Sequence, residues 1–263
     1  MAIPIYHVDA FVTEKPFSGN PAGVCILERP ANEDWMKGIA REMNLSETAF
    51  LDRRSDGFNL RWFTPTVEVA LCGHATLGSA HVLWERKYLG PDDRGIFHTK
   101  SGVLTAVKQE NRITLDFPAK DAEPIQPPSS LLTALGVTAL YTGKNQFDYL
   151  VEVGSDSEVL QASPNFSLLR SLSVRGVIVT ARSSTPGYDF ISRFFAPGSG
   201  IDEDPVTGSA HCALGPYWQK KLKKDTFVAY QASARGGILS VRVNGDRVSL
   251  AGRAVTVMQG EVL

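Results

Sequence analysis

The chain repeats one pattern of residues in its two halves, and this repeat limits the folds that it can adopt. Residues 58–80, "FNLRWFTPTVEVALCGHATLGSA", align without gaps on residues 190–212, "FISRFFAPGSGIDEDPVTGSAHC". Both copies pass from an aromatic strand through Pro and an acidic turn into a helix of small residues. Identical residues pair as Phe58/Phe190, Arg61/Arg193, Phe63/Phe195 and Pro65/Pro197. The repeat predicts two similar halves, and chance similarity between two strand–turn–helix units is the alternative.

The helix at the end of each copy indicates how each half is built. "CGHATLGSAHVLW" and "DPVTGSAHCALGPYW" are small or apolar nearly all round, which is typical of a buried helix. We therefore expect an α+β fold of two pseudo-symmetric halves, each a strand barrel around a central helix, facing each other across a cleft. The expected halves are residues 1–120 and 121–263, with the last strand able to cross to the first half. The Pro-rich stretch 118–130 is the expected linker.

Hydrophobic periodicity and turn residues predict many short strands and few helices. Asn32 and Asn44 are the expected N-cap and left-handed stop of the first helix. Helices are predicted over residues 32–43, 73–88, 128–135, 155–161 and 205–221. Strands are predicted over 3–12, 22–27, 47–53, 59–64, 95–99, 102–108, 111–117, 148–153, 176–181, 188–195, 226–231, 237–243, 247–251 and 254–258.

Charge and cysteine usage exclude several classes of function. The formal net charge is −1, and the basic residues are scattered, which argues against nucleic acid or an anionic membrane as partner. Cys25, Cys72 and Cys212 lie far apart without a CxxC pair, as expected of a reduced cytoplasmic protein without disulfides or a structural zinc site. We find no signal peptide and no apolar run long enough to span a bilayer, so we expect a soluble cytoplasmic protein.

The stretch "NLSETAF", residues 44–50, places a carboxylate in a strand that reads as buried. Strand alternation would put Glu47 on one face with Leu45, Ala49 and Leu51. Burying an unpaired charge is costly, so Glu47 is a candidate functional acid. An apolar environment would raise its pKa toward neutrality. The alternative is a buried acid paired with a neighbour.

The repeat aligns Cys72 with Asp204, both expected just before a helix, where unpaired N–H groups attract anions. His74 follows within the first turn, and there the helix dipole would lower its pKa. His74 is otherwise a histidine satisfied in the core, and Cys72 a small buried side chain.

The segment "IDEDPVTGSA" is the corresponding helix start of the second copy. Asp202, Glu203 and Asp204 would form an acidic cap region with Pro205 at the first helical position, which is also good helix design by itself. The Gly208-Ser209 pair supplies backbone that a ligand can approach. Cys25 and Cys212 read as packing residues. His7, His81, His98 and His211 have no assigned role.

Taken together, "DAFVTEKPFSGNPAGVCIL", "IAREMNLSETAFL", "RWFTPTVEVALCGHATLGSA", "DEDPVTGSAHC" and the late "ARGG" resemble the PhzF phenazine-biosynthesis-like family, most of all its MAWD-binding-protein-like members. The resemblance implies a diaminopimelate-epimerase-like fold with the site between the halves. It implies that Glu47 is the acid/base residue, supported by His74 and Asp204.

The resemblance also implies the binding residues. Backbone donors at Gly73, Gly208 and Ser209 would hold a substrate carboxylate, with Thr207 in the same motif. Asn20 of "FSGNPAGV" would line the pocket, although Gly19-Asn20-Pro21 is also a plain turn signature. Cys72 completes the expected set.

Two departures from related enzymes limit the expected activity. Epimerases of this fold use a pair of cysteines, and here Asp204 stands in the place of the second, so a two-thiol epimerase is not expected. The phenazine enzyme itself lacks the cysteine, so its substrate is not transferred. We expect a cofactor-independent isomerase that moves a proton on a small carboxylate-bearing molecule, without metal or nucleotide. The resemblance implies a homodimer. The sequence itself has no exposed apolar stripe that would indicate one. The rivals are a thiol enzyme that uses Cys72 and a non-catalytic binding or scaffold protein.

Overall fold

The computed structural model describes residues 2–263 and divides the chain into two compact units. Unit 1 contains the residues up to Phe117 together with Leu250–Leu263, and unit 2 is Pro118–Ser249. Sequence analysis placed the boundary after residue 120, three residues beyond the observed one. Both units combine a mixed sheet with few helices, so the predicted α+β class is confirmed.

Unit 1 contains most of the strands of the first half and the last strand of the chain. Its helices are α1 (Glu33–Met43) and α2 (Gly73–Glu85). Its strands are β1 (Ile3–Ala10), β2 (Asn20–Leu27), β3 (Glu47–Arg54), β4 (Gly57–Phe63), β5 (Glu68–Val69), β6 (Gly95–Thr99), β7 (Gly102–Gln109), β8 (Arg112–Pro118) and β17 (Ala254–Val262).

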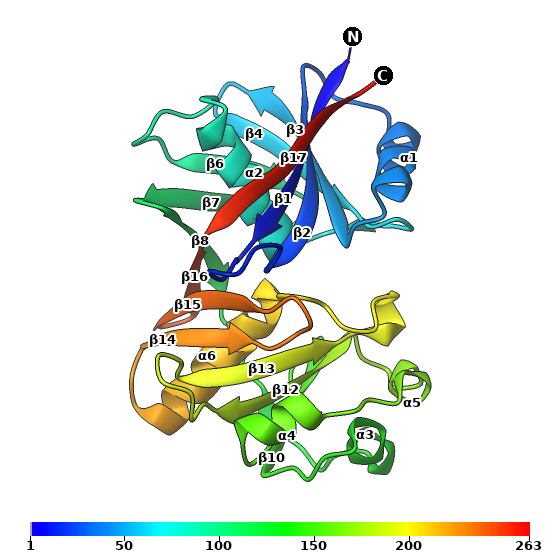
Figure 1. Ribbon diagram of the computed structural model, residues 1–263, viewed down its shortest axis with the longest axis vertical. Coiled ribbons are helices and arrows are strands. Elements are labelled where there is room, and N and C mark those ends of the chain that lie inside the picture. The colour runs from blue at the N-terminus through cyan, green and yellow to red at the C-terminus, as the bar shows by residue number, and fades with distance from the viewer. Residues whose placement is uncertain (1) are drawn as a thin grey trace. The chain divides into compact units, whose positions relative to one another are not determined.

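Helix α2 is the core of unit 1. It packs against β1, β2, β3 and β17, and in Figure 1 the strands of this unit lie around it. All residues from His74 to Ala80 are buried. The two hydroxyl side chains among these residues bond to backbone carbonyls one turn earlier: Ser79 donates to Ala75 at 2.7 Å, and Thr76 donates to Cys72. Gly78 faces Val8 of β1 and Val24 of β2.

Unit 2 contains the remaining elements. Its helices are α3 (Ser129–Leu135), α4 (Asp156–Gln161), α5 (Phe166–Arg170) and α6 (Gly208–Leu222), with a short 3₁₀ turn at Pro197–Ser199. Its strands are β9 (Glu123–Pro124), β10 (Tyr141–Lys144), β11 (Asp148–Glu152), β12 (Gly176–Arg182), β13 (Phe190–Phe195), β14 (Thr226–Gln231), β15 (Gly237–Asn244) and most of β16 (Arg247–Gly252).

Helix α6 has the same role in unit 2 that α2 has in unit 1. Its face contains Gly215, and a Cβ there would lie 3.0 Å from Val243 and 3.2 Å from Val241 of β15. A Cβ here would require these valine side chains to shift by a few tenths of an ångström, so the glycine allows the observed close packing of strand and helix. Helices α4 and α5 flank the same unit in Figure 1.

The ladders of the two units repeat one order of pairings. In unit 1, β2 is parallel to β3, β3 antiparallel to β4, β4 parallel to β6, and β6 antiparallel to β7. In unit 2, β11, β12, β13, β14 and β15 follow each other with the same alternation. Helix α2 connects β4 to β6, and α6 connects β13 to β14. The predicted pseudo-symmetry of the halves is therefore confirmed.

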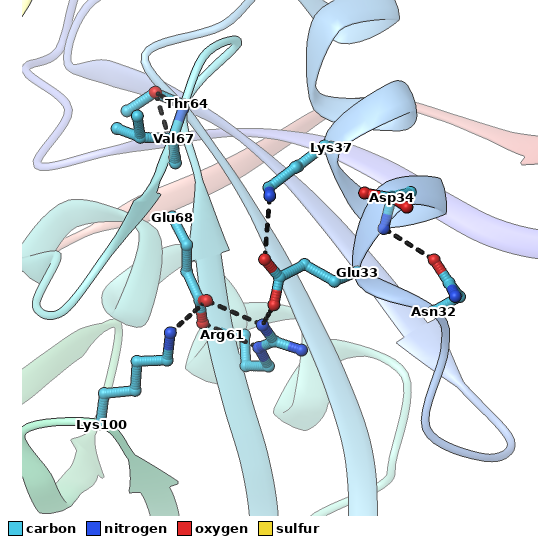
Figure 2. A network of polar contacts seen from close by, with 9 residues as sticks. All are labelled: Asn32, Glu33, Asp34, Lys37, Arg61, Thr64, Val67, Glu68 and Lys100. Carbon is cyan, nitrogen blue, oxygen red and sulfur yellow. Dashed lines mark hydrogen bonds and ion pairs between the residues drawn. The ribbon is translucent and has the colours of Figure 1, made fainter.

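An arginine brace repeats as well. Arg61 of β4 forms two hydrogen bonds of 2.7 Å with Glu68 (Figure 2). Its guanidinium also lies 5.1 Å from the centre of the Phe63 ring. Arg193 of β13 forms the same bidentate pair with Glu203, at 2.7 and 2.9 Å. Bidentate pairs fix geometry as well as charge. Each brace holds the segment that leads from the strand into the central helix.

Figure 2 shows that the brace of unit 1 extends to α1. Arg61 also contacts Glu33 at 2.6 Å, and Glu33 pairs with Lys37 at 2.9 Å, while Lys100 reaches Glu68. The first turn of α1 is capped by Asn32, whose side chain accepts from the Asp34 N–H at 2.7 Å. This charge network ties α1 to β4 at the edge of the unit.

Three parts of the predicted secondary structure need correction. Helix α6 begins at Gly208 and not at 205, because Pro205 lies in the preceding loop. The stretch 118–130 is not a free linker: the Lys120 N–H donates to the Cys212 carbonyl at 2.9 Å, and β9 pairs with β10. Four short elements were not predicted, namely β5, β9, β10 and α5.

The lengths and composition of the helices bear on membrane insertion. Within residues 2–263, no helix is long and apolar enough to cross a bilayer.

Candidate functional site

Glu47 is the first residue of β3, and the two faces of this strand differ. Phe50 points toward α1, where it packs against Trp35. Since side chains alternate along a strand, Ala49 and Leu51 share the opposite, α2-facing side with Glu47. Both are fully buried. Leu45 was predicted on this face, but it precedes the strand, in the turn after α1. The carboxylate therefore lies at the end of an apolar strand face.

His74, the second residue of α2, is the partner of this carboxylate. Its Nε2 lies 3.3 Å from Glu47 Oε2, and the side chains are 6% and 13% exposed. Burial lowers the pKa of His74 to about 3, while the nearby Pro21 carbonyl acts in the opposite direction. The predicted neutral imidazole is thus explained by desolvation rather than by the helix dipole. At neutral pH, Glu47 faces an uncharged ring.

Asn20, the first residue of β2, orients that ring. Its Nδ2 lies 3.1 Å from His74 Nδ1, and its Oδ1 accepts from the Ser46 hydroxyl at 3.5 Å. An amide nitrogen can only donate, so Nδ1 accepts this bond and the ring proton resides on Nε2. The N–H of His74 is thereby placed on the ring edge that lies nearer Glu47, 3.3 Å from its Oε2, in a contact that does not have hydrogen-bond geometry. Asn20 itself is fully buried.

Cys72 is the N-cap residue of α2 and is buried. Its Sγ lies 3.6 Å from His74 Nδ1, on the ring edge that also receives the Asn20 amide. Glu47, Cys72 and His74 each offer one ligand or proton-transfer atom, and these atoms all lie within 4.8 Å of one another. The structure therefore brings together four of the predicted residues in unit 1.

The start of α2 adds backbone donors to this group. Among the described residues, the N-cap side chains of α2 and α6 make no capping bond, whereas α1, α4 and α5 are capped by Asn32, Ser155 and Asn165. Helix α3 begins after Pro128 and is also uncapped. The first-turn N–H groups of α2, beginning at Gly73, can therefore receive an anion.

In unit 2 the predicted residues gather at the start of α6. Thr207 is the N-cap, and Gly208 and Ser209 are the first two helical residues. Asp204 lies in the preceding loop rather than at the helix start, and its Oδ2 accepts from the Thr207 hydroxyl at 2.5 Å. Asp204 is half-buried. The Asp204 carboxylate is thus bound by the hydroxyl of the residue at the N-cap position of α6.

Two further residues, which sequence analysis missed, support this loop. Gln231, fully buried at the end of β14, accepts from the Thr207 N–H at 2.8 Å and donates to the Asp204 carbonyl at 2.8 Å. Its Nε2 also lies 3.1 Å from the Thr207 hydroxyl. The Ser233 hydroxyl donates to the Pro205 carbonyl at 2.8 Å. A glutamine at the end of an apolar strand was the only sequence signal.

The other acids and cysteines that were considered are structural. Asp202 contacts Arg170 at 3.4 Å, and Glu203 forms the Arg193 brace. Cys25 is fully buried, and burial raises the pKa of its thiol to about 12. The Cys212 thiol donates within α6 to the Gly208 carbonyl at 3.6 Å.

The histidines without a predicted role also have neighbours. His81 lies 3.6 Å from Glu85, His98 3.2 Å from Asp56, and His7 3.9 Å from Asp9. His211 is fully buried in α6, where its Nδ1 bonds to the Thr207 carbonyl at 2.8 Å.

Comparison with known proteins places this arrangement in a family. Residues 8–260 match the model of the phenazine biosynthesis-like protein family, PhzC-PhzF. A protein of Halalkalibacterium halodurans, described as an uncharacterized isomerase, is 54% identical, with 100% of this chain and 99% of that protein covered.

Solved structures agree. A crystal structure of a PhzF family protein from Enterococcus faecalis matches with a TM-score of 0.95 and 42% identity, and the match covers 100% of both chains. A predicted epimerase from Pseudomonas aeruginosa matches with a TM-score of 0.79 and 19% identity over 99% of both chains, which bears on the fold alone. The expected diaminopimelate-epimerase-like fold is confirmed. The chain belongs to the PhzC-PhzF phenazine biosynthesis-like family.

Proposed function

We propose that this protein is a cofactor-independent isomerase that moves a proton on a small carboxylate-bearing substrate, with Glu47 as the proton carrier. Relatives described as isomerases support the reaction class. The contact of 3.3 Å between Glu47 Oε2 and His74 Nε2 carries the assignment of the residue. Glu47 would take a proton from an acidified carbon and return it to another carbon on the same face, so that no net oxidation occurs.

The environment of Glu47 supports this role. His74 is uncharged at neutral pH because burial lowers its pKa to about 3. The His74 ring beside Glu47 is therefore uncharged, and a neutral neighbour does not lower the pKa of a carboxylate as a cation at the same distance would. Positioned proton transfer of this kind contributes ~10²–10⁴-fold in rate. The Nε2–H of His74 would orient the carboxylate, or stabilise the oxygen on which charge develops.

The start of α2 would hold the substrate carboxylate, since Gly73 begins its uncapped first turn. In unit 2, Gly208 and Ser209 begin the uncapped first turn of α6, which offers N–H groups of the same kind. Uncapped N–H groups and the helix dipole favour an anion. We also propose that Asp204 and Thr207 take part in the same reaction. The sequence repeat and the family motif support this separate proposal. The cytoplasmic location and the homodimer also remain predictions.

A thiol mechanism is the rival that one specific contact favours. Cys72 Sγ lies 3.6 Å from His74 Nδ1, the spacing expected of a nucleophile and its base. The Asn20 amide, however, already donates to this nitrogen, so the lone pair that would take the thiol proton is occupied. The geometry favours Glu47 as the group that reacts.

The test is a screen of small carboxylic acids for exchange of a carbon-bound proton with solvent deuterium. The wild-type protein should label one or more acids by NMR or mass spectrometry, without added metal or nucleotide. Cys212→Ser serves as the matched cysteine control, since its thiol donates to the Gly208 carbonyl within α6. A protein that labels none of the acids while binding them would support the scaffold alternative and contradict the proposal.

A further inference from the structure

We propose that Glu47, Cys72 and His74 form a binding site for a thiophilic divalent cation, and that the site binds Zn²⁺ most tightly. The bound ion would act as an inhibitor rather than as a cofactor. Their ligand atoms lie within 4.8 Å of one another. A carboxylate oxygen, a thiolate and an imidazole nitrogen are the three ligand types that zinc prefers. Metal binding is measured without substrate and does not depend on the isomerase proposal, whereas the inhibitory effect of the ion rests on that proposal.

The distances already approach those of a coordinated ion. Two ligands on one tetrahedral zinc lie about 3.3 Å apart for an oxygen and a nitrogen, and about 3.6 Å for a nitrogen and a sulfur. The observed separations are 3.3 Å for Glu47 Oε2 and His74 Nε2, and 3.6 Å for Cys72 Sγ and His74 Nδ1. The two pairs use opposite ring nitrogens. A single ion on Nε2 requires rotation of Cys72, movement of the ring proton from Nε2 to Nδ1, and a turn of the Asn20 amide so that its Oδ1 accepts from Nδ1–H.

The surroundings favour a soft ion over a hard one. Cys72 and His74 are buried and Glu47 is nearly so, so the ion must exchange most of its water for protein ligands. Mg²⁺ gives up its water reluctantly and prefers oxygen ligands, whereas Zn²⁺ and Co²⁺ accept sulfur and nitrogen. Binding would displace the Cys72 thiol proton to solvent, as metal–thiolate bonds require. An ion held here occupies the proposed proton carrier.

The experiment titrates the reduced full-length protein with Co²⁺ and then with Zn²⁺. Co²⁺ should produce a thiolate-to-cobalt charge-transfer band at one equivalent, and Zn²⁺ should abolish the band by displacement. Cys72→Ser should remove the band. Glu47→Gln should weaken Zn²⁺ binding about tenfold or more, as measured by competition with a chromophoric chelator. Mg²⁺ should not compete.

Matched variants separate this site from adventitious binding. Cys212→Ser keeps all three proposed ligands, Glu47, Cys72 and His74. It should leave the charge-transfer band and the Zn²⁺ affinity unchanged. His81→Ala removes the His81–Glu85 pair on the outer side of α2 and should also leave both unchanged. A circular dichroism spectrum shows whether each variant folds. If Cys72→Ser does not fold, the Zn²⁺ affinity of Glu47→Gln provides an independent test of the site. Absence of a charge-transfer band in the wild type, its persistence in Cys72→Ser, or its loss in Cys212→Ser would overturn the proposal.

Discussion

Glu47 Oε2 lies 3.3 Å from Nε2 of His74, and the histidine is held neutral by its burial. A charged imidazolium at this distance would fix the carboxylate as one half of an ion pair. A neutral ring at this distance does not hold the carboxylate in the charged form as an imidazolium would. This relationship leads to the following predictions.

Replacing Cys72 by Ser should leave the solvent exchange of a substrate proton within about tenfold of the wild type, since the thiol is not the group that reacts. Iodoacetamide labelling should locate Cys72 by mass spectrometry, with Cys212→Ser as the control. If Cys72→Ala abolishes turnover while Glu47→Gln leaves it intact, the glutamate mechanism is wrong.

Replacing Asn20 by Leu should lower kcat about tenfold, because His74 loses the bond that directs its Nε2–H toward Glu47. The free energy of unfolding should also fall by roughly 1–3 kcal/mol, because a buried ring nitrogen loses its donor. Asn59→Leu is the control: Asn59 donates to Asp52 at 2.6 Å on the same sheet, so only stability should change. Equal loss of kcat in both variants would show that Asn20 is merely structural.

Replacing Gln231 by Leu should release the loop that carries Asp204, because Gln231 accepts from Thr207 N–H and donates to the Asp204 carbonyl. The expected loss is roughly 1–3 kcal/mol in the free energy of unfolding, measured with urea. Gln219→Leu, which removes an exposed bond to Asp225, should cost less than about 1 kcal/mol. A neutral result at Gln231 would mean that the loop is held without it.

Acidification should destabilise the protein through His211. Burial lowers the pKa of His211 from 6.5 to about 4. Between these values the unfolded chain binds more protons than the folded one, so stability rises with pH. The contribution is complete above pH 6.5 and is lost as the pH falls toward 4. Thermal unfolding followed across this range should show a shallower slope in His211→Gln than in the wild type, and identical slopes would contradict this account.

Much of the architecture could be predicted from sequence because it depends on patterns that are local. The two helices without a polar face, Asn32 as the α1 cap and Asn44 as its left-handed end were each predicted from neighbouring residues, and the structure contains them. The start of α6 was predicted wrongly for a related reason: Pro205 is a favourable first helical residue, but Gln231 and Ser233, distant in sequence, hold that segment as a loop.

The candidate site was harder to predict than the fold. Glu47 stood out because an acid on an apolar strand face is costly. The repeat, which placed His74 and Asp204 near two helix starts, and then the motif resemblance brought in these two residues. The direction of the His74 proton depends on Asn20, which approaches the ring from another strand. No spacing along the chain encodes that contact. Short elements such as β5 and β9 escaped prediction because two-residue strands carry no periodicity.

The most direct test of the central claim is the rate of solvent-deuterium incorporation into a carboxylate substrate, compared between wild type and Glu47→Gln. The variant keeps the shape of the side chain but cannot carry the proton. The account predicts a fall of ~10²–10⁴-fold in the exchange rate, with substrate binding and the thermal unfolding midpoint little changed. Exchange at the wild-type rate in Glu47→Gln would contradict it.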